Sequence, residues 1–196
     1  SGAHGVQGTL RAPVSPAERT HDYVVVGHVS RDIVPTTGAV QIGGTAFYSG
    51  LQAARLGLRT RIVTAGVPDE IAALVAPFAD ELDVEVQRAA ATTSFEASGV
   101  GRGRRLRVVA WAGPIAPPES LDAAILHLAP VARETAGIVT HGAGFVGITP
   151  QGLIRRWDQD GEVRQVALDP AALPDRLDAL VISDTERDEC RAAVAA

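Results

Sequence analysis

The chain has 196 residues, of which 46% are hydrophobic and only 4% aromatic, and its formal net charge is −5. This length suits a single domain, and the composition indicates a sizeable core of aliphatic side chains. The negative charge argues against binding to nucleic acid or to anionic membranes, and no stretch approaches the roughly 18 uninterrupted apolar residues of a membrane span. The single cysteine, Cys190, cannot form an internal disulfide, which is typical of a reducing compartment, so we expect a cytoplasmic protein.

The first 22 residues are rich in Gly, Pro and Ala. They lack the apolar run of roughly 7–15 residues that a signal peptide requires. We therefore expect a disordered N-terminal arm over residues 1–22, followed by one domain over residues 23–196.

From there on, strand patterns alternate with helix patterns. A short β-branched run at Val24–Val26 predicts a buried strand that ends near Asp32. Helices are predicted at Ala46–Leu56, with Gly57 in the position that commonly follows a helix, and at Glu70–Ala79. Further strands or short apolar pieces are predicted at Thr60–Ala65, Val84–Arg88, Ile125–Leu128, Gly137–Thr140, Phe145–Ile148, Arg164–Leu168 and Ala179–Ile182. This alternation predicts an α/β fold with a doubly wound, mostly parallel sheet that is covered on both faces.

A glycine pair stands directly before the first helix. Because Gly43 and Gly44 have no Cβ, backbone N–H groups there can approach a ligand closely, and a helix N-terminus adds unpaired donors. Asp32, at the end of the preceding strand, can accept hydrogen bonds from the same ligand. The alternatives are that the glycines only allow the chain to turn and that Asp32 only caps a turn.

Residues 92–115 interrupt the alternation. A strand pattern that includes Phe95 is followed by a glycine- and arginine-rich turn and then by a second strand pattern that begins near Arg105. This order predicts a β-hairpin, which needs another surface to cover because isolated hairpins are weak in water. Arg105 is a candidate to reach an anionic group of a substrate, and the alternative is a solvated surface hairpin.

The segment Gly142–Gly147 matches the pattern G-x-G-x-x-G, and Asp169 follows about 20 residues later, as in a dinucleotide-binding site. Pro150 and Gly152 follow almost at once, so no regular helix can start there to bind a pyrophosphate. A Rossmann-type oxidoreductase that uses NAD is therefore the least favoured of the functions considered. It predicts that Gly142–Gly147 links a strand to a helix.

Residues 23–69 resemble the N-terminal part of the ribokinase-like (PfkB-type) carbohydrate kinases. The shared order is a strand, a glycine, an acidic residue, the pair Gly43 and Gly44, a small-residue helix that closes in Leu56 and Gly57, and a second strand. Tyr48 stands where many members of the family have Asn. The resemblance extends over most of residues 23–190, but only to the N-terminal part of the family pattern.

The resemblance implies a ribokinase-like fold in which residues 92–112 belong to a β lid over the sugar. It implies an ATP- and Mg²⁺-dependent kinase that phosphorylates a hydroxyl of a sugar, polyol or nucleoside, with a homodimer formed through lid strands as a further expectation. The substrate-binding residues that it implies are Asp32, Gly43, Gly44, Tyr48, Phe95 and Arg105. Glu186 falls where the family carries an acid that helps to organise magnesium through water. The alternative is that Asp184 and Glu186 only cap and charge the first turn of a terminal helix.

The catalytic signature of that family, Gly-Ala-Gly-Asp, is absent from the 196 residues. Gly142, Ala143 and Gly144 are followed by Phe145, and they precede Glu186, whereas the family signature follows the equivalent acid. We therefore expect the domain to be incomplete at its C-terminal side, with no catalytic base in this chain. Three explanations stay open: a truncated kinase, a non-catalytic sugar-binding relative, and a fold that a partner chain completes.

Overall fold

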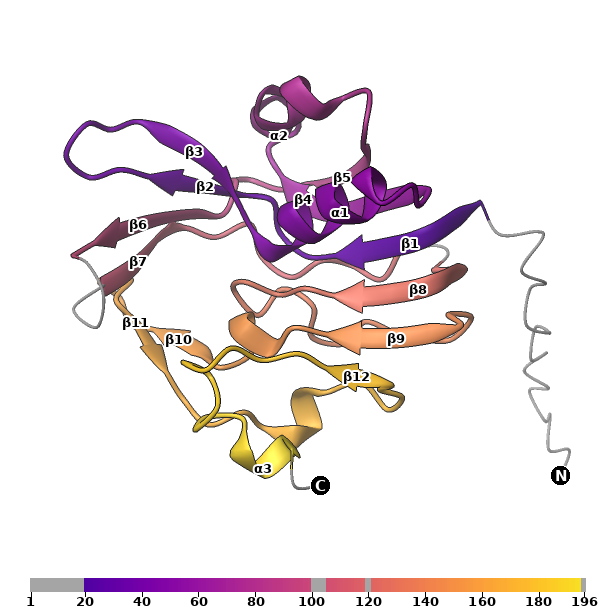
Figure 1. Ribbon diagram of the computed structural model, residues 1–196. Helices are drawn as coiled ribbons and strands as arrows, with labels where there is room; N and C mark the ends of the chain where they lie inside the picture. Colours follow the sequence, from indigo (N-terminus) through magenta and orange to yellow (C-terminus); the bar gives the residue numbers. More distant parts are fainter. Residues whose placement is uncertain (1–19, 100–104, 119–120, 195–196) are drawn as a thin grey trace, which may run out of the picture.

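The computed structural model describes residues 20–99, 105–118 and 121–194 (Figure 1). Its centre is a six-stranded sheet with the order β12-β9-β8-β1-β4-β5, in which every pairing is parallel. In that order the strands are Ala179–Leu180, Phe145–Ile148, Ala123–Leu128, His21–Val26, Thr60–Gly66 and Asp83–Arg88. The chain fills one side of β1 with β4 and β5 and then the other side with β8, β9 and β12, which confirms the predicted doubly wound, parallel sheet. The order reverses between β1 and β8, and such a switch point is where ligands bind open α/β sheets.

The β-branched run of β1 explains its central place. Val24 and Val26 pack into one core cluster, and Val25 packs into a second cluster on the opposite face of the sheet. All three side chains are at most 2% exposed. A strand that is buried on both faces reads as a continuous apolar run, as this one does.

Helices cover one face of the sheet, and largely non-helical segments cover the other. The helices α1 (Thr45–Arg55) and α2 (Pro68–Val75), with the 3₁₀ turn η2 (Ala76–Phe78), pack against the cluster that contains Val25. The second cluster is covered by segments that contain the 3₁₀ turns η4 (Pro150–Gly152) and η5 (Pro170–Ala172) and the four-residue helix α3 (Arg191–Val194). The predicted piece at residues 137–140 forms no strand there. No helix among the described residues is both long and apolar enough to cross a bilayer.

A second sheet, the lid, projects from the carboxyl edge of the first (Figure 1). Its order is β3-β2-β6-β7, with strands Val40–Gly43, Ser30–Ile33, Ser94–Ser98 and Arg105–Ala110. The predicted hairpin is present as β6 and β7, but the lid is larger than predicted because the chain leaves the parallel sheet after β1 and forms β2 and β3 before α1. A small hairpin of β10 (Arg155–Trp157) and β11 (Val163–Gln165) joins β7 through a bridge between Arg107 and Glu162.

Candidate functional site

The expected pairing of an acid with the glycine turn is present. Asp32 lies in β2, and Gly43 ends the neighbouring antiparallel strand β3. A Cβ placed on Gly43 would lie 2.5 Å from Asp32 Oδ1 and 2.6 Å from the other two carboxyl atoms. The Ser30 hydroxyl donates to Asp32 Oδ1 at 3.2 Å. Only glycine leaves room for the carboxylate at this point, so the side chain of Asp32 lies directly on the bare backbone of Gly43.

The second glycine has a structural requirement of its own. Gly44 has a φ of 100°, which disfavours any L side chain, and a Cβ there would lie 2.2 Å from the carbonyl oxygen of His28. Gly44 is also the N-cap of α1, so the N-cap residue has no side chain with which to cap the helix, and no acidic residue stands in the first turn. The first N–H groups of a helix have no intrahelical partner, so they offer donors beside the Asp32 carboxylate.

The lid face that carries Asp32 turns towards the carboxyl end of β8. Asp32 pairs with Phe95 of β6, and paired residues of neighbouring strands lie on the same face. Phe95 is 4% exposed and packs with Val131 and Ala132, which follow β8. The guanidinium of Arg155 stands 5.6 Å from the centre of the Phe95 ring and donates to the Val131 carbonyl at 2.9 Å. Phe95 is therefore part of the packed base of this region, and Arg155 is a cation there that the sequence did not indicate.

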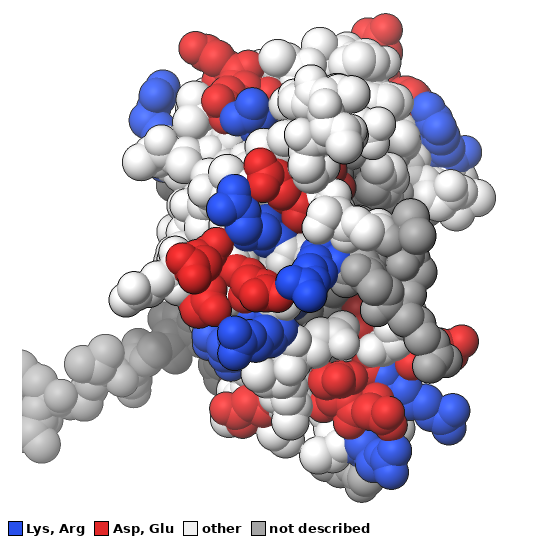
Figure 2. Space-filling view, turned by 90° about the vertical axis from the view of Figure 1, so that its left-hand side faces the viewer, with Lys and Arg blue, Asp and Glu red and all other residues white. Residues whose placement is uncertain are grey.

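Arg105 lies elsewhere. It pairs with Ser98, an odd number of residues from Phe95, so the pleat directs Arg105 to the opposite face of the lid. Its side chain is 79% exposed, and its nearest acid is Glu162 at 3.9 Å. Figure 2 looks onto the side of the molecule that carries the lid, where arginine and acidic side chains are interspersed. The structure therefore does not bring Arg105 to Asp32.

Tyr48 lies on the outer side of the glycine turn. The residue is 58% exposed, and its hydroxyl donates to the Ile42 carbonyl at 3.0 Å. Its ring meets Phe47 edge to face at 5.1 Å. The phenol thus ties the first turn of α1 to β3, one residue before Gly43.

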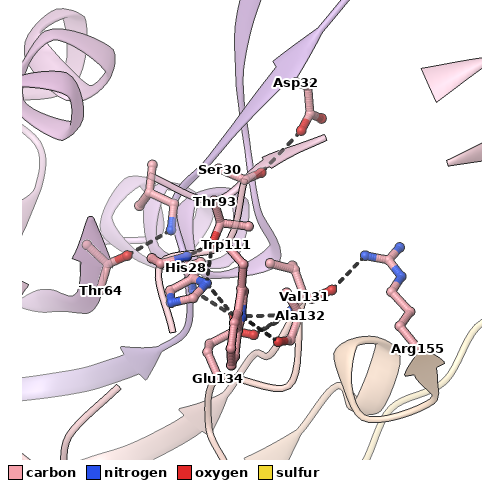
Figure 3. Close-up of polar contacts among 12 residues, drawn as sticks. His28, Ser30, Asp32, Thr64, Thr93, Trp111, Val131, Ala132, Glu134 and Arg155 are labelled. Atoms are coloured by element: carbon pink, nitrogen blue, oxygen red, sulfur yellow. Dashed lines mark hydrogen bonds and ion pairs between the residues drawn. The ribbon is translucent and has the colours of Figure 1, made fainter. Parts of the chain in front are cut away.

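A buried polar network that no sequence pattern predicted lies next to the glycine turn (Figure 3). Glu134 is fully buried, and its Oε1 accepts from the backbone N–H of His28 at 2.8 Å and of Val131 at 2.9 Å. Its Oε2 accepts from the N–H of Ala132 at 2.7 Å. His28 is equally buried, and its Nδ1 lies 2.8 Å from the hydroxyl of Thr93 at the start of β6. The 106 residues that separate His28 from Glu134 hide this pairing from any local sequence pattern.

Burial lowers the pKa of His28 below its usual value of 6.5, against smaller opposing effects of the Glu134 charge and of the Gly113 backbone. The imidazole is therefore neutral at physiological pH. Because the Ala112 N–H already donates to the Thr93 oxygen at 3.0 Å, the Thr93 hydroxyl is free to donate its proton to Nδ1 of the neutral ring.

Glu186 does not lie in a metal cluster. Its side chain is nearly buried, and its Oε2 accepts from the Ser183 N–H at 2.8 Å, so the carboxylate closes the turn after β12. The described ranges contain no group of three or more His, Cys, Asp or Glu residues that could hold a metal ion. β12 stands three strands from β1, which at the usual strand spacing is roughly 14 Å. The role of Glu186 in organising magnesium through water stays a prediction.

The glycine pattern at Gly142–Gly147 does not form a dinucleotide site. It runs into strand β9, after which come a single 3₁₀ turn at Pro150–Gly152 and then β10. No α-helix begins directly after these glycines, which is what the Rossmann interpretation predicted, so the structure does not favour that interpretation. A hollow of about 480 Å³ lies beside this segment, between residues 135–142 and 171–176, and neither Asp32 nor the glycine turn lines it.

Solved structures with this architecture come from the ribokinase family of kinases. One is a pyrophosphate-dependent kinase in the ribokinase family complexed with a pyrophosphate analog and myo-inositol: it is 18% identical, the match covers 88% of this chain and 69% of that chain, and the TM-score is 0.74. Another is Arabidopsis thaliana ribokinase complexed with ribose and ATP, at 20% identity, 87% and 62% coverage and a TM-score of 0.57. No family model matches the sequence, and no curated protein is significantly similar to it. At such low identity the likeness establishes the fold, which is ribokinase-like as predicted.

Proposed function

We propose that Asp32, the glycine turn at Gly43 and Gly44, and the start of α1 form the acceptor-binding part of a ribokinase-like carbohydrate kinase. The acceptor is a sugar or polyol whose hydroxyl groups donate to the Asp32 carboxylate and accept from the backbone at Gly43, Gly44 and the start of α1. The observation that carries the proposal is the close approach of the Asp32 carboxylate to the backbone of Gly43, beside a helix whose N-cap residue is the glycine Gly44. A carboxylate next to backbone N–H donors of a helix N-terminus matches the hydroxyl group, which both donates and accepts.

The position of this pair in the fold supports the same function. Asp32 and the glycine turn follow β1, whose neighbours β4 and β8 mark the point where the strand order reverses. Small ligands bind open α/β sheets at that point, beyond the carboxyl ends of the strands. The lid carries Asp32 on the face that turns towards the sheet, so a bound acceptor would lie between the two layers.

Phosphoryl transfer needs a donor as well as an acceptor. We propose ATP as the donor, as in the ribokinase complex, with pyrophosphate as the alternative that the kinase with the higher TM-score uses. In the reaction an acceptor hydroxyl attacks the terminal phosphorus of the donor and loses its proton to a base, and catalysis depends mostly on positioning and charge stabilisation. No Gly-Ala-Gly-Asp motif occurs in the 196 residues, so we expect them to bind the acceptor without transferring phosphate.

A homodimer through lid strands is part of the proposal. β3 forms one edge of the lid sheet, and its first residue Val40 is 41% exposed. An open strand edge presents unpaired backbone groups that can pair with a second copy. Sedimentation velocity on the chain and on Val40→Lys tests this, because an added charge at a paired edge should shift a dimer towards monomer.

Calorimetry tests the acceptor site. The wild-type chain is titrated with myo-inositol, ribose, fructose and adenosine, and the tightest binder is then titrated into Asp32→Ala and into Asp80→Ala, an exposed acid on the far side of η2. We expect Asp32→Ala to weaken binding by about 1–3 kcal/mol, the cost of losing a hydrogen bond to a charged group, and Asp80→Ala to change nothing. Equal affinity of the two variants would remove Asp32 from the site.

A second candidate function is sugar binding without kinase activity, because acceptor binding at Asp32 and the glycine turn needs no Gly-Ala-Gly-Asp motif and none occurs in the 196 residues. The two candidates differ in whether a longer form of the protein phosphorylates the bound acceptor. Intact-mass analysis of the native gene product shows whether residues follow Ala196, and an assay of that product with ATP and with pyrophosphate separates the candidates. Turnover by a verified 196-residue chain would contradict our account of where the base lies.

A further inference from the structure

We infer that Glu134 is a positioning residue, whose buried carboxylate holds the hinge between the parallel sheet and the lid and so fixes the glycine turn against Asp32. The inference deepens the proposed function, on which its consequence for acceptor binding rests. Glu134 touches neither Asp32 nor the glycines itself. It acts through His28, the residue at which the chain leaves β1 for the lid.

The local geometry around Glu134 is unusual for an acid. The side chain is 0% exposed, and three backbone N–H groups from two separate segments surround its two oxygens. A buried carboxylate is costly unless its lone pairs are used, and here the backbone donors use them. The preceding residue, Arg133, has a φ of 66°, the only positive φ outside glycine in the described part of the chain. Strain of this kind persists only where surrounding contacts impose it, and the hydrogen bonds from the backbone to the Glu134 carboxylate are such contacts.

His28 carries the effect of Glu134 to the glycine turn. The His28 N–H is held by Glu134, and its carbonyl oxygen lies where a Cβ of Gly44 would be. The same residue is tied sideways through its imidazole to Thr93. Moving the backbone at His28 therefore moves Gly44 and the start of α1, and it moves β2, in which Asp32 lies four residues later.

Three of the four crossings between the parallel-sheet layer and the lid meet at this network, and the remaining one leads from β3 through Gly44 into α1. Of these three, the first contains His28, the second contains Thr93, and the third contains Ala112, whose N–H donates to the Thr93 hydroxyl at 3.0 Å. The indole N–H of Trp111 in the third crossing donates to the Ala132 carbonyl at 2.9 Å, within the loop that Glu134 organises. One hydrogen-bonded unit thus fixes the lid to the loop after β8 (Figure 3). Phe95 packs on the same loop.

The test compares two Glu134 variants with a matched control. Glu134→Asp is one methylene shorter, so it keeps a carboxylate near the N–H groups of its own loop but withdraws from the His28 N–H. Glu134→Gln places an amide donor against one of the backbone donors. The control is Asp178→Asn, because Asp178 also accepts a backbone N–H, that of Val146 at 2.8 Å, but at the start of β9, opposite the lid.

Amide hydrogen exchange followed by NMR gives a readout that needs no ligand. In the wild-type chain the His28 amide should exchange as slowly as that of Val25 in the centre of β1. In Glu134→Asp we expect exchange at residues 28–33 and 44–48 to accelerate about tenfold or more, the scale of one lost buried hydrogen bond, with α2 unchanged. Fast exchange of His28 in the wild type, or the same local acceleration in Asp178→Asn, would overturn the inference. Even if neither Glu134 variant folds, the exchange rate of the His28 amide in the wild type shows whether its N–H is held in a buried hydrogen bond, as the inference requires.

A second arm separates this inference from the proposed function. Myo-inositol and ribose are titrated into the wild type, Glu134→Asp and Asp178→Asn well below their unfolding temperatures. We expect the acceptor dissociation constant to rise at least about fivefold in Glu134→Asp and to stay constant in the control, because only the first variant shifts the glycine turn. An unchanged constant in Glu134→Asp overturns the positioning role. If the wild type binds neither polyol, the proposed function fails, and the exchange data still decide whether Glu134 fixes the hinge.

Discussion

Replacing Gly43 and Gly44 with Ala, one at a time, should separate effects on acceptor binding from effects on stability. The reason is that Gly43 lies against a side chain and Gly44 against the backbone. In Gly43→Ala the new methyl group would lie 2.5 Å from Asp32 Oδ1, which is the far end of a side chain that can rotate. In Gly44→Ala it would lie 2.2 Å from the His28 carbonyl oxygen, which is backbone, at a φ of 100°. Only the first clash can be relieved without moving the chain.

The magnitudes follow from these contacts. To reach an ordinary contact of about 3.5 Å the Asp32 carboxylate must move by roughly 1 Å, and an off-rotamer side chain costs about 0.5–1.5 kcal/mol. Ala gains about 0.5–1 kcal/mol over Gly in a strand, so we expect the free energy of unfolding of Gly43→Ala to stay within about 1 kcal/mol of wild type. Acceptor binding should weaken by about 1–3 kcal/mol, because the carboxylate no longer faces the same hydroxyl. For Gly44→Ala we expect a loss of at least about 2 kcal/mol of stability from the positive φ and the backbone clash together.

Urea unfolding followed by tryptophan fluorescence measures stability, and calorimetry with the best acceptor measures binding. A Gly43→Ala chain that binds the acceptor as well as wild type does would refute the reasoning, since it would show that the placement of Asp32 on the glycine backbone is unrelated to binding. A Gly44→Ala chain of wild-type stability would refute the contact with His28.

Two further predictions concern His127 and Tyr48. His127 lies in β8, in the middle of the parallel sheet, and burial lowers its pKa to about 4. The folded state therefore resists protonation, while the unfolded chain takes up a proton near pH 6.5. The free energy of unfolding is expected to fall as the pH falls from 6.5 towards 4, by about 2 kcal/mol at pH 5 relative to pH 7. Because Phe cannot titrate, His127→Phe should remove the contribution of His127 to the difference between the urea midpoints at pH 7 and pH 5. An unchanged difference would show that His127 does not cause this loss of stability. Tyr48→Phe removes only the hydrogen bond to the Ile42 carbonyl, so we expect it to lower the free energy of unfolding by about 0.5–1.5 kcal/mol in urea melts, and no loss at all would mean that the phenol does not tie α1 to β3.

Much of the parallel sheet could be predicted because its signals are local. The Val24–Val26 run, the small-residue helix that ends at Gly57 and the next strand each have a periodicity and a boundary residue within a few positions, and the structure contains all three. The glycine turn and its acid were also recognisable, since the positive φ of Gly44 favours glycine and a Cβ at residue 43 would crowd the Asp32 carboxylate.

The rest depended on pairing between distant segments. The hairpin of β2 and β3 consists of two four-residue strands that are mostly exposed or half-buried, so it shows no alternation of apolar residues. The face on which Arg105 lies is set by its pairing with Ser98, and a shift by one residue would reverse it. Glu134 reaches His28 across 106 residues, and the sequence showed only an acid shortly after the apolar strand that Pro130 bounds.

The central claim is that a polyol is held between the Asp32 carboxylate and the glycine turn. A crystal structure of the chain with its best-binding polyol tests this most directly. We predict ligand hydroxyl oxygens at about 2.6–3.2 Å from the Asp32 carboxylate and from a backbone nitrogen of residues 43–46. A polyol bound instead in the hollow between residues 135–142 and 171–176, with no ligand atom in contact with the Asp32 carboxylate, would contradict it.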